Sequence, residues 1–165
     1  MFQTTVNITQ APAVAGDFAS ANPRHSVLSM PGGFVAGPNG LLVGQFCWAD
    51  TATGLILSNA GTGVPTGFVH RDLQATNYVY LSEATMLIPA GQGVGELFNG
   101  GDFWVKNTGA GAVATMMKAY ASLTTGQVQF AATAQTISGY IETKWYAMSI
   151  GAAGELIKMS DTPLG

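Results

Sequence analysis

Charged side chains are scarce in this chain of 165 residues. Only 9% of the residues are Asp, Glu, Lys or Arg, against about 25% in ordinary soluble domains. A solitary monomer with so few charges is poorly protected against association. The scarcity predicts a surface covered by uncharged polar side chains, by other protein, or by both.

Basic residues are few as well, and they do not cluster. The six Lys and Arg residues are scattered singly along the chain, under a formal net charge of −3. Binding of nucleic-acid phosphates requires a patch of cations. We therefore expect no nucleic-acid partner.

Cysteines and long apolar runs are also lacking. The single cysteine, Cys47, excludes an internal disulfide and zinc sites of the Cys-x-x-Cys kind. Residues 25–49 and 119–141 lack Asp, Glu, Lys and Arg, but Gly, Pro and hydroxyl residues interrupt them. Neither offers the roughly 20 consecutive apolar residues of a membrane-spanning helix, so we expect no membrane partner. The first ten residues lack the basic start and apolar core of a signal peptide, which predicts folding in a cytosolic compartment.

Short apolar runs separated by Gly-rich turns occupy most of the chain. The first clear turn is "GPNG" at 37–40, where Asn-Gly supplies residues that tolerate positive φ. Strand-forming runs such as "LLVGQFCWA" (41–49) follow, and "GELFNGGDFWVKN" (95–107) is typical of two strands joined at Asn-Gly-Gly. Turn signals every 8–12 residues favour an all-β fold. We expect one compact β-barrel or β-sandwich over residues 41–165.

The segment before this domain lacks a regular pattern of apolar residues. Residues 11–24, "APAVAGDFASANPR", follow neither the period of a strand nor that of a helix. We predict that residues 1–40 form an extended, mostly irregular N-terminal arm. The arm carries too many apolar side chains to leave in water, so we expect it to bind a partner: Phe2, Val6, Ile8, Val14 and Phe18.

One segment is ambiguous between helix and strand. Residues 112–123, "AVATMMKAYASL", place apolar side chains at helical spacing, yet the neighbouring segments have strand patterns. We expect a strand.

Apparent catalytic motifs are incomplete. "HRDLQATN" (70–77) matches the catalytic-loop pattern of protein kinases, with Asp72 as base and Asn77 on magnesium. No lysine precedes residue 106, and "GDFW" (101–104) lacks the last glycine of the metal-binding Asp-Phe-Gly. "GQGVGELF" (91–98) has Glu96 where a dinucleotide loop needs its last glycine. We predict no catalytic residues and no cofactor-binding residues.

Metal and sugar sites have only weak signals. His25 and His70 are lone histidines, so we predict no metal site. A convergent pair among the nine carboxylates would allow a glycosidase, an alternative that the sequence leaves open. Three tryptophans, Trp48, Trp104 and Trp145, would form a sugar-binding platform if they were exposed on one face, although aromatics in strands usually belong to the core.

Several segments resemble the structural cement proteins of tailed bacteriophages, which decorate and brace the capsid shell. The resemblance rests on "FQTTVN" (2–7), "QAPAVAGDFASANPR" (10–24), "PTGFVHR" (65–71), "IPAGQGVGELFNGGDFWVKN" (88–107) and "TMMKAYA" (115–121). It covers about the first three-quarters of the chain. Met116 and Met117 depart from the Gly-containing version expected in the last of these segments.

The resemblance implies a non-enzymatic capsid decoration protein that binds the outer surface of the major capsid protein shell and stabilises it. It implies a homotrimer on the capsid exterior of the virion, made in the host cytoplasm. The arm would be the clasp, with interface residues Phe2, Val6, Ile8, Val14, Asp17, Phe18 and Arg24. The alternative is a head-exposed binding module for host attachment or carbohydrate recognition.

Overall fold

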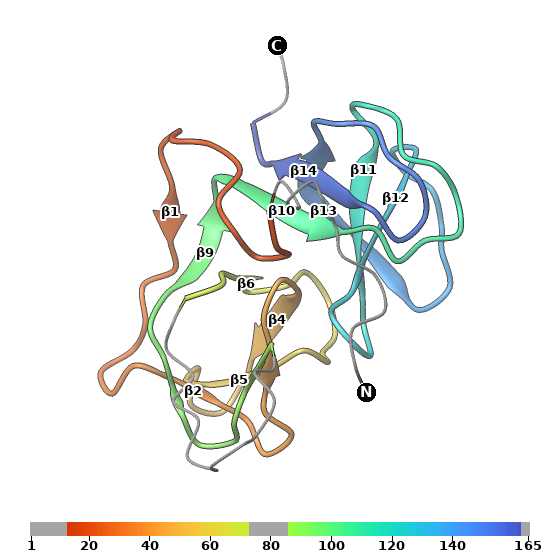
Figure 1. Ribbon diagram of the computed structural model, residues 1–165. Helices are drawn as coiled ribbons and strands as arrows, with labels where there is room; N and C mark the ends of the chain where they lie inside the picture. The colour runs from red at the N-terminus through yellow and green to blue at the C-terminus, as the bar shows by residue number, and fades with distance from the viewer. Residues whose placement is uncertain (1–12, 73–85, 163–165) are drawn as a thin grey trace, which may run out of the picture.

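The computed structural model describes residues 13–72 and 86–162 (Figure 1), and the described residues form strands, turns and loops without a helix. No helix of this part of the chain is therefore long and apolar enough to cross a membrane. The fourteen strands are β1 His25–Ser26, β2 Phe34–Ala36, β3 Leu41–Leu42, β4 Phe46–Ala49, β5 Ile56–Ser58, β6 Gly67–Val69, β7 Leu87–Ile88, β8 Gly93–Val94, β9 Leu97–Gly100, β10 Asp102–Lys106, β11 Lys118–Ser122, β12 Val128–Ala131, β13 Tyr140–Ala147 and β14 Leu156–Ser160. The predicted all-β class is confirmed.

The strands form two main sheets and one short pair. The first sheet has seven strands in the order β1-β9-β6-β4-β5-β2-β8, and only the β2–β5 pairing is parallel. The second has five antiparallel strands in the order β10-β14-β13-β11-β12, and β3 pairs with β7. Figure 1 places the five-stranded sheet at the upper right, beyond β6 and β4. The sheets share a core, as expected of a sandwich-like fold.

An aromatic cluster joins the two sheets. The ring of Phe68 on β6 lies 5.1 Å from that of Phe103 on β10, and Phe103 lies 5.7 Å from Trp145 on β13, measured between centroids. Phe46 on β4 packs edge-on against Phe68 at 5.5 Å. These tilted and edge-to-face arrangements are the favourable ones for aromatic pairs, worth about 0.5–1.5 kcal/mol each beyond the buried area. The cluster therefore fixes one sheet on the other.

A second core lies on the opposite face of the seven-stranded sheet. Successive residues of a strand point to opposite faces, so Phe46 joins the aromatic cluster while Cys47 joins the second core. Phe68 and Val69 divide in the same way on β6. Burial on both faces explains why these strands appear in the sequence as continuous apolar runs. Burial also raises the pKa of the Cys47 thiol, which keeps it protonated and unreactive.

Two glycines mark sharp changes of direction that the sequence indicates. Gly101, at a φ of +123°, separates β9 in the first sheet from β10 in the second. The two strands predicted around Asn-Gly-Gly are therefore present, but they belong to different sheets. Gly40 closes the predicted turn at 37–40 with a φ of +74°.

Part of the predicted arm belongs to the first sheet. Strands β1 and β2 contribute two and three residues to it, and Phe34 and Ala36 are buried. The division of the chain into an arm and a β domain at residue 40 stays a prediction.

The ambiguous segment 112–123 is a strand only in its second half. β11 begins at Lys118, and residues 114–117 form a tight turn in which Met116 has a φ of +69°. This left-handed conformation is unfavourable for residues other than glycine, because it brings Cβ close to the backbone. Met116 is thus one of the two residues, with Met117, that depart from the Gly-containing version of this segment implied by the resemblance.

Replacing Met116 with glycine should stabilise the fold. The left-handed conformation costs an L-residue about 1–2 kcal/mol, and the extra unfolded-state entropy of glycine offsets about 0.5–1 kcal/mol of that gain. The Met116 side chain is 41% exposed, so its loss removes little packing. We expect Met116→Gly to raise the free energy of unfolding by up to about 1 kcal/mol in urea titrations. Met117→Gly, which removes a side chain packed on the aromatic core, should lower it.

Candidate interaction surfaces

The arm root, residues 13–24, runs along the edge of the five-stranded sheet. Backbone hydrogen bonds join it to β10: Gly16 N donates to Trp104 O at 2.7 Å, and Trp104 N donates to Asp17 O at 2.9 Å. Ala19 N donates to Asp102 O at 2.9 Å. An uncovered edge strand would offer these groups to other chains. The arm root therefore closes this edge within its own chain.

Phe18 anchors the arm root in the aromatic cluster. Its ring stacks on His70 with centroids 3.8 Å apart and planes 21° apart. The guanidinium carbon of Arg24 lies 3.7 Å from the same ring centroid, so Arg24 and His70 must occupy opposite faces of the Phe18 ring. Such cation–π contacts contribute about 0.5–1 kcal/mol at exposed sites.

Polar contacts hold the arm root beside β6. The Asp17 carboxylate pairs with Arg71 at 3.2 Å, and Nδ1 of His70 lies 2.7 Å from Gly16 O. His70, which the kinase-like pattern singled out, thus fixes the arm root. Three predicted interface residues, Asp17, Phe18 and Arg24, make contacts inside their own chain, and Val14 is exposed. Phe2, Val6 and Ile8 lie outside the described residues, and an interface role for the seven residues stays a prediction.

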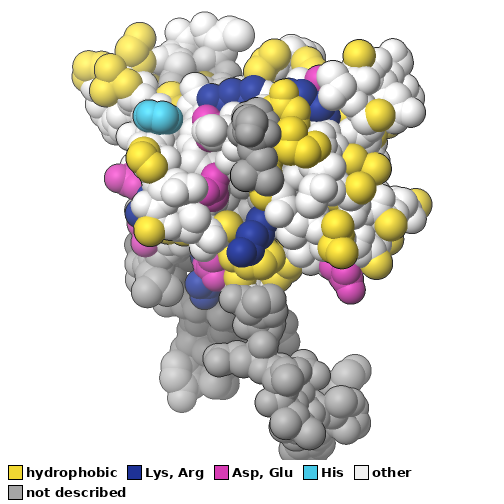
Figure 2. Space-filling view, turned by 90° about the horizontal axis from the view of Figure 1, so that it is seen from above, with side chains coloured by type: hydrophobic (Ala, Val, Ile, Leu, Met, Phe, Trp, Pro, Cys, Tyr) yellow, Lys and Arg dark blue, Asp and Glu magenta, His cyan; other side chains and the backbone are white. Residues whose placement is uncertain are grey.

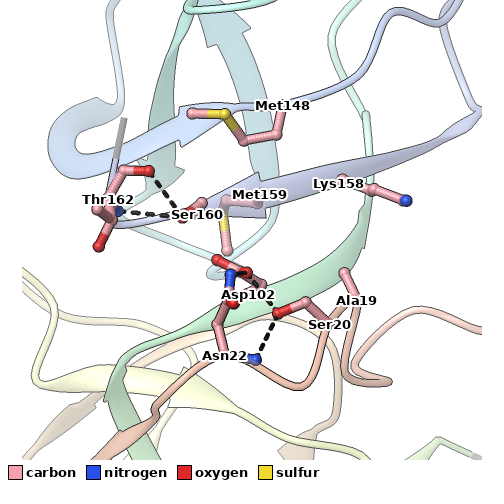
Figure 3. Close-up of a pocket in the computed structure, with 9 residues that line it drawn as sticks. All are labelled: Ala19, Ser20, Asn22, Asp102, Met148, Lys158, Met159, Ser160 and Thr162. Atoms are coloured by element: carbon pink, nitrogen blue, oxygen red, sulfur yellow. Dashed lines mark hydrogen bonds between the residues drawn. The ribbon is translucent and has the colours of Figure 1, made fainter. Parts of the chain in front are cut away.

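A groove of about 260 Å³ separates the arm root from β14 (Figure 3). At its floor, Asp102 accepts hydrogen bonds from Ser20 Oγ at 2.5 Å and Asn22 Nδ2 at 2.6 Å. Partial burial raises the pKa of Asp102, but the hydrogen bonds from Ser160, Ser20 and Asn22 together outweigh it and hold the pKa below its ordinary value. The groove's carboxylate therefore binds the arm root to the sheet.

A second hollowed surface is formed by residues of β3, β4, β5 and β7 and of the loops beside them. Two hollows of about 400 and 300 Å³ share Ser58 and Ala60. We call them together the neutral groove. Its lining residues are Asn39, Gly40, Leu42, Trp48, Ala49, Asp50, Thr51, Ile56, Ser58, Asn59, Ala60, Gly61, Thr62, Leu87, Thr124 and Thr125.

The neutral groove belongs to a part of the chain almost devoid of charge. Within residues 25–69 and 86–95, the only Asp, Glu, Lys or Arg is Asp50. Its carboxylate accepts hydrogen bonds from the backbone N–H groups of Thr53, Ile56 and Leu55, at 2.8, 2.9 and 3.1 Å. The bond from Thr53 contributes most, and together these bonds lower the pKa of Asp50 to about 2. This single charge therefore holds the 50–56 turn in place.

Large apolar side chains are exposed on the same part of the chain. Leu42 and Ile56 line the two hollows of the neutral groove, and Ile56 is 43% exposed. Leu28, 94% exposed, Met30 and Val64 stand out from neighbouring loops. Contiguous exposed apolar surface is typical of protein-binding faces, which makes this part of the chain a candidate interaction surface.

Lysines gather on the outer face of the five-stranded sheet. The register places Trp104 opposite Lys158 and Lys118 opposite Tyr146, on the side away from Phe103 and Val105. Lys106 and Lys144 share that face by strand alternation. Figure 2 shows several Lys and Arg side chains on the side that is uppermost in Figure 1, with Asp and Glu side chains among them. Four of the six basic residues thus lie on this sheet, whereas Asp50 is the one charged residue that lines the neutral groove.

The structure does not assemble a sugar-binding platform from the tryptophans. Trp48 and Trp145 are buried in the core, and Trp104 is half-buried with Lys158 Nζ 5.2 Å from its ring centroid. Asn77 of the kinase-like pattern lies outside the described residues. In the parts of the chain that the structure describes, no three His, Cys, Asp or Glu residues are grouped as metal ligands would be.

Comparison with known proteins identifies the family. The family model of the XM1 gp53 minor capsid protein matches residues 2–161. The chain belongs to this family.

A solved structure supports the same fold. A chain from the capsid of Myoviridae phage XM1 superposes with a TM-score of 0.70 at 18% sequence identity, over 98% of this chain and 97% of that chain. No curated protein matches. The predicted resemblance to a phage capsid-associated family is confirmed, so this protein has a structural, capsid-associated role and belongs to the virion.

The pH dependence of the protein's stability should show the contribution of the ionised Asp50 carboxylate to the 50–56 turn. A carboxyl whose pKa is lower in the folded state stabilises the fold above its unfolded pKa, here 3.8, and this contribution is lost as the pH falls toward 2. Asp50→Asn should lower the melting temperature at pH 7, and its difference from the parent should shrink between pH 4 and 2. A difference that stays constant over this range would contradict the assignment. NMR titration of the Asp50 carboxyl carbon measures the pKa directly.

Proposed function

We propose that this minor capsid protein is a non-enzymatic cement protein that binds the outer surface of the major capsid protein shell and stabilises it. The observation that carries the proposal is the neutral groove with its exposed apolar rim. Asp50 is the one charged residue that lines the groove, so docking this surface removes few charges from water and keeps that large cost small. Each exposed side chain of the Ile56 or Leu42 kind that becomes covered adds about 1 kcal/mol.

The segregation of charge suggests an orientation on the particle. With the neutral groove on the shell, the lysine-bearing face of the five-stranded sheet points away from it. Lys106, Lys144 and Lys158, which are exposed, then remain hydrated on the exterior, where they favour solubility of the particle. Lys118 on the same sheet is buried, and its Nζ donates to Thr143 O. This orientation accounts for a chain that has few charges and keeps four of its six basic residues on one sheet.

Repetition would convert a modest contact into firm attachment. We propose a homotrimer in which each protomer binds one junction of the shell, since linked sites gain avidity without any stronger single contact. Closed cyclic symmetry also avoids an open, polymerising face. The N-terminal arm, with Phe2, Val6 and Ile8, is the proposed clasp to the shell or to a sister protomer. A carbohydrate-recognising head protein, the alternative function, gains no support from the buried Trp48 and Trp145.

A charge placed in the neutral groove should abolish docking. Ile56→Lys puts an ammonium on the surface that the shell would cover, beside the Asp50 carboxylate that accepts a hydrogen bond from Ile56 N. Burying such a pair of charges is costly because both lose their hydration. We expect at least about tenfold weaker binding to capsids that lack the protein, equivalent to about 1.4 kcal/mol. Co-sedimentation with such capsids measures it.

The matched control is Thr133→Lys, which adds the same charge on an exposed residue beyond β12. It should bind like the parent, and circular dichroism should find both variants folded. Folded Ile56→Lys that saturates capsids with unchanged affinity would disprove docking through the neutral groove.

Removal of residues 1–12 tests the arm. The deletion should stop before the arm root, because Phe18 packs on His70 and Phe103 of its own chain. We expect the truncated protein to keep the melting temperature of the parent but to lose trimer formation or capsid binding, read by light scattering and co-sedimentation. Undiminished trimerisation and capsid affinity would show that the arm is not the clasp.

A further inference from the structure

The dipeptide Asn39-Gly40 lies at the rim of the neutral groove. The Asn39 side chain is exposed in the turn of residues 37–40, which Gly40 N closes by donating to Gly37 O at 2.9 Å. Asparagine followed by glycine is the sequence most open to deamidation, because glycine has no Cβ to hinder its own backbone nitrogen. The groove thus has a chemically labile neutral side chain at its edge.

The reaction needs only water. The backbone nitrogen of Gly40 bonds to the side-chain Cγ of Asn39, and the amide nitrogen leaves as ammonia. Water then opens the cyclic imide, and the backbone continues either through the α-carboxyl, giving aspartate, or through the side chain, giving isoaspartate. The net change converts a neutral amide and one water into a carboxylate and an ammonium ion. An aspartate of ordinary pKa is ionised at neutral pH.

Packing keeps the reactive glycine in place. A Cβ on Gly40 would lie 2.8 Å from Ile88 O and 2.8 Å from Leu87 Cδ1, and its φ of +74° disfavours other residues. The chain therefore cannot remove the labile bond by substituting Gly40 without disturbing β7. Asn39 alone can change.

The same dipeptide occurs a second time in a protected setting, which provides an internal control. Asn99-Gly100 also exposes its asparagine side chain, but it lies in β9 between two paired residues. Phe98 pairs with Ser26 of β1 and Phe68 of β6, and Gly100 pairs with His25 of β1. Ring closure requires the backbone to rotate. At Asn39 the turn bond from Gly40 N to Gly37 O and the packing of Gly40 on β7 oppose this rotation, whereas at Asn99 both neighbouring residues are held in the ladder of a sheet. Asn99 should therefore react more slowly than Asn39.

We propose that Asn39 is a spontaneous deamidation site, and that its conversion places a negative charge on the neutral groove and withdraws aged, unassembled protein from capsid binding. The functional half of this proposal rests on the proposed docking through the groove. On an assembled particle the shell would cover the turn and slow the reaction. Deamidation would thus distinguish free protein that has aged from protein that has already docked.

The experiment ages the purified full chain at pH 8 and 37 °C and follows each site by peptide mass spectrometry. We expect a gain of about 1 Da at the Asn39 peptide well before any at the Asn99 peptide. Equal rates at the two sites, or no reaction at Asn39, would overturn the chemical claim. Protein bound to capsids and aged in parallel should react several-fold more slowly at Asn39, and an equal rate would overturn the protection.

Capsid binding tests the consequence separately. Asn39→Asp should bind at least about tenfold more weakly than the parent, whereas Asn39→Gln, which closes its ring far more slowly, should bind normally and keep its affinity on ageing. Normal binding by Asn39→Asp while Ile56→Lys fails would overturn the consequence and leave docking through the groove intact. Normal binding by both variants would reject docking through the groove as well.

Discussion

Burial of the central strands β4 and β6 on both faces of the seven-stranded sheet is the constraint on which the rest of the fold depends. At β4, β6 and β9, each pair of neighbouring residues sends one side chain to the aromatic cluster and the next to the second core, as Leu97 and Phe98 do. A chain of this size buries about two-thirds of its unfolded surface. Here that burial is divided between two cores that share the same strands. Little room remains for charged side chains along the middle of the sheet.

Core burial explains the missing charge in the strands but not in the loops. Residues 27–33, 37–40, 59–66 and 89–92 are loops that lead to or from strands of the first sheet, and none contains Asp, Glu, Lys or Arg. The loops 50–55 and 95–96 contain one charge each, Asp50 and Glu96. Leu28 and Val64 in the uncharged loops are exposed, so no interior requires them to be apolar. Solvated loops normally carry charge at little cost. The neutrality of the loops is therefore a property of the surface, and it is the stronger argument for an interface.

The sequence predicts the class of fold well because its signals are local. Turn glycines and strand-forming runs predict the strands around Gly40 and Gly101, and the structure has both turns. Local patterns do not specify which strands pair, so the assignment of β9 and β10 to different sheets lies beyond them. Local patterns also fail to predict that the strand in 112–123 begins only at Lys118. The turn before it places Met116 in a left-handed conformation that methionine disfavours, so the local sequence does not predict the turn. Tertiary contacts, such as the bond from Met116 N to Ala147 O at 2.8 Å, hold it there.

The neutral groove and the arm root could be predicted only in part, because their contacts join residues that are distant in the sequence. The sequence shows that residues 25–49 lack Asp, Glu, Lys and Arg. From the sequence alone, this observation serves only to ask whether the segment could form a membrane-spanning helix. Its meaning as a surface depends on Ser58, Ala60 and Leu87 converging on Leu42 from distant parts of the chain. The arm root presents the converse case. Phe18 and Arg24 are predicted to bind a partner, yet Phe18 packs on His70 and Phe103 of its own chain, and Arg24 lies over the Phe18 ring. An irregular apolar segment must find partners, and composition alone does not say whether they belong to its own chain or to another.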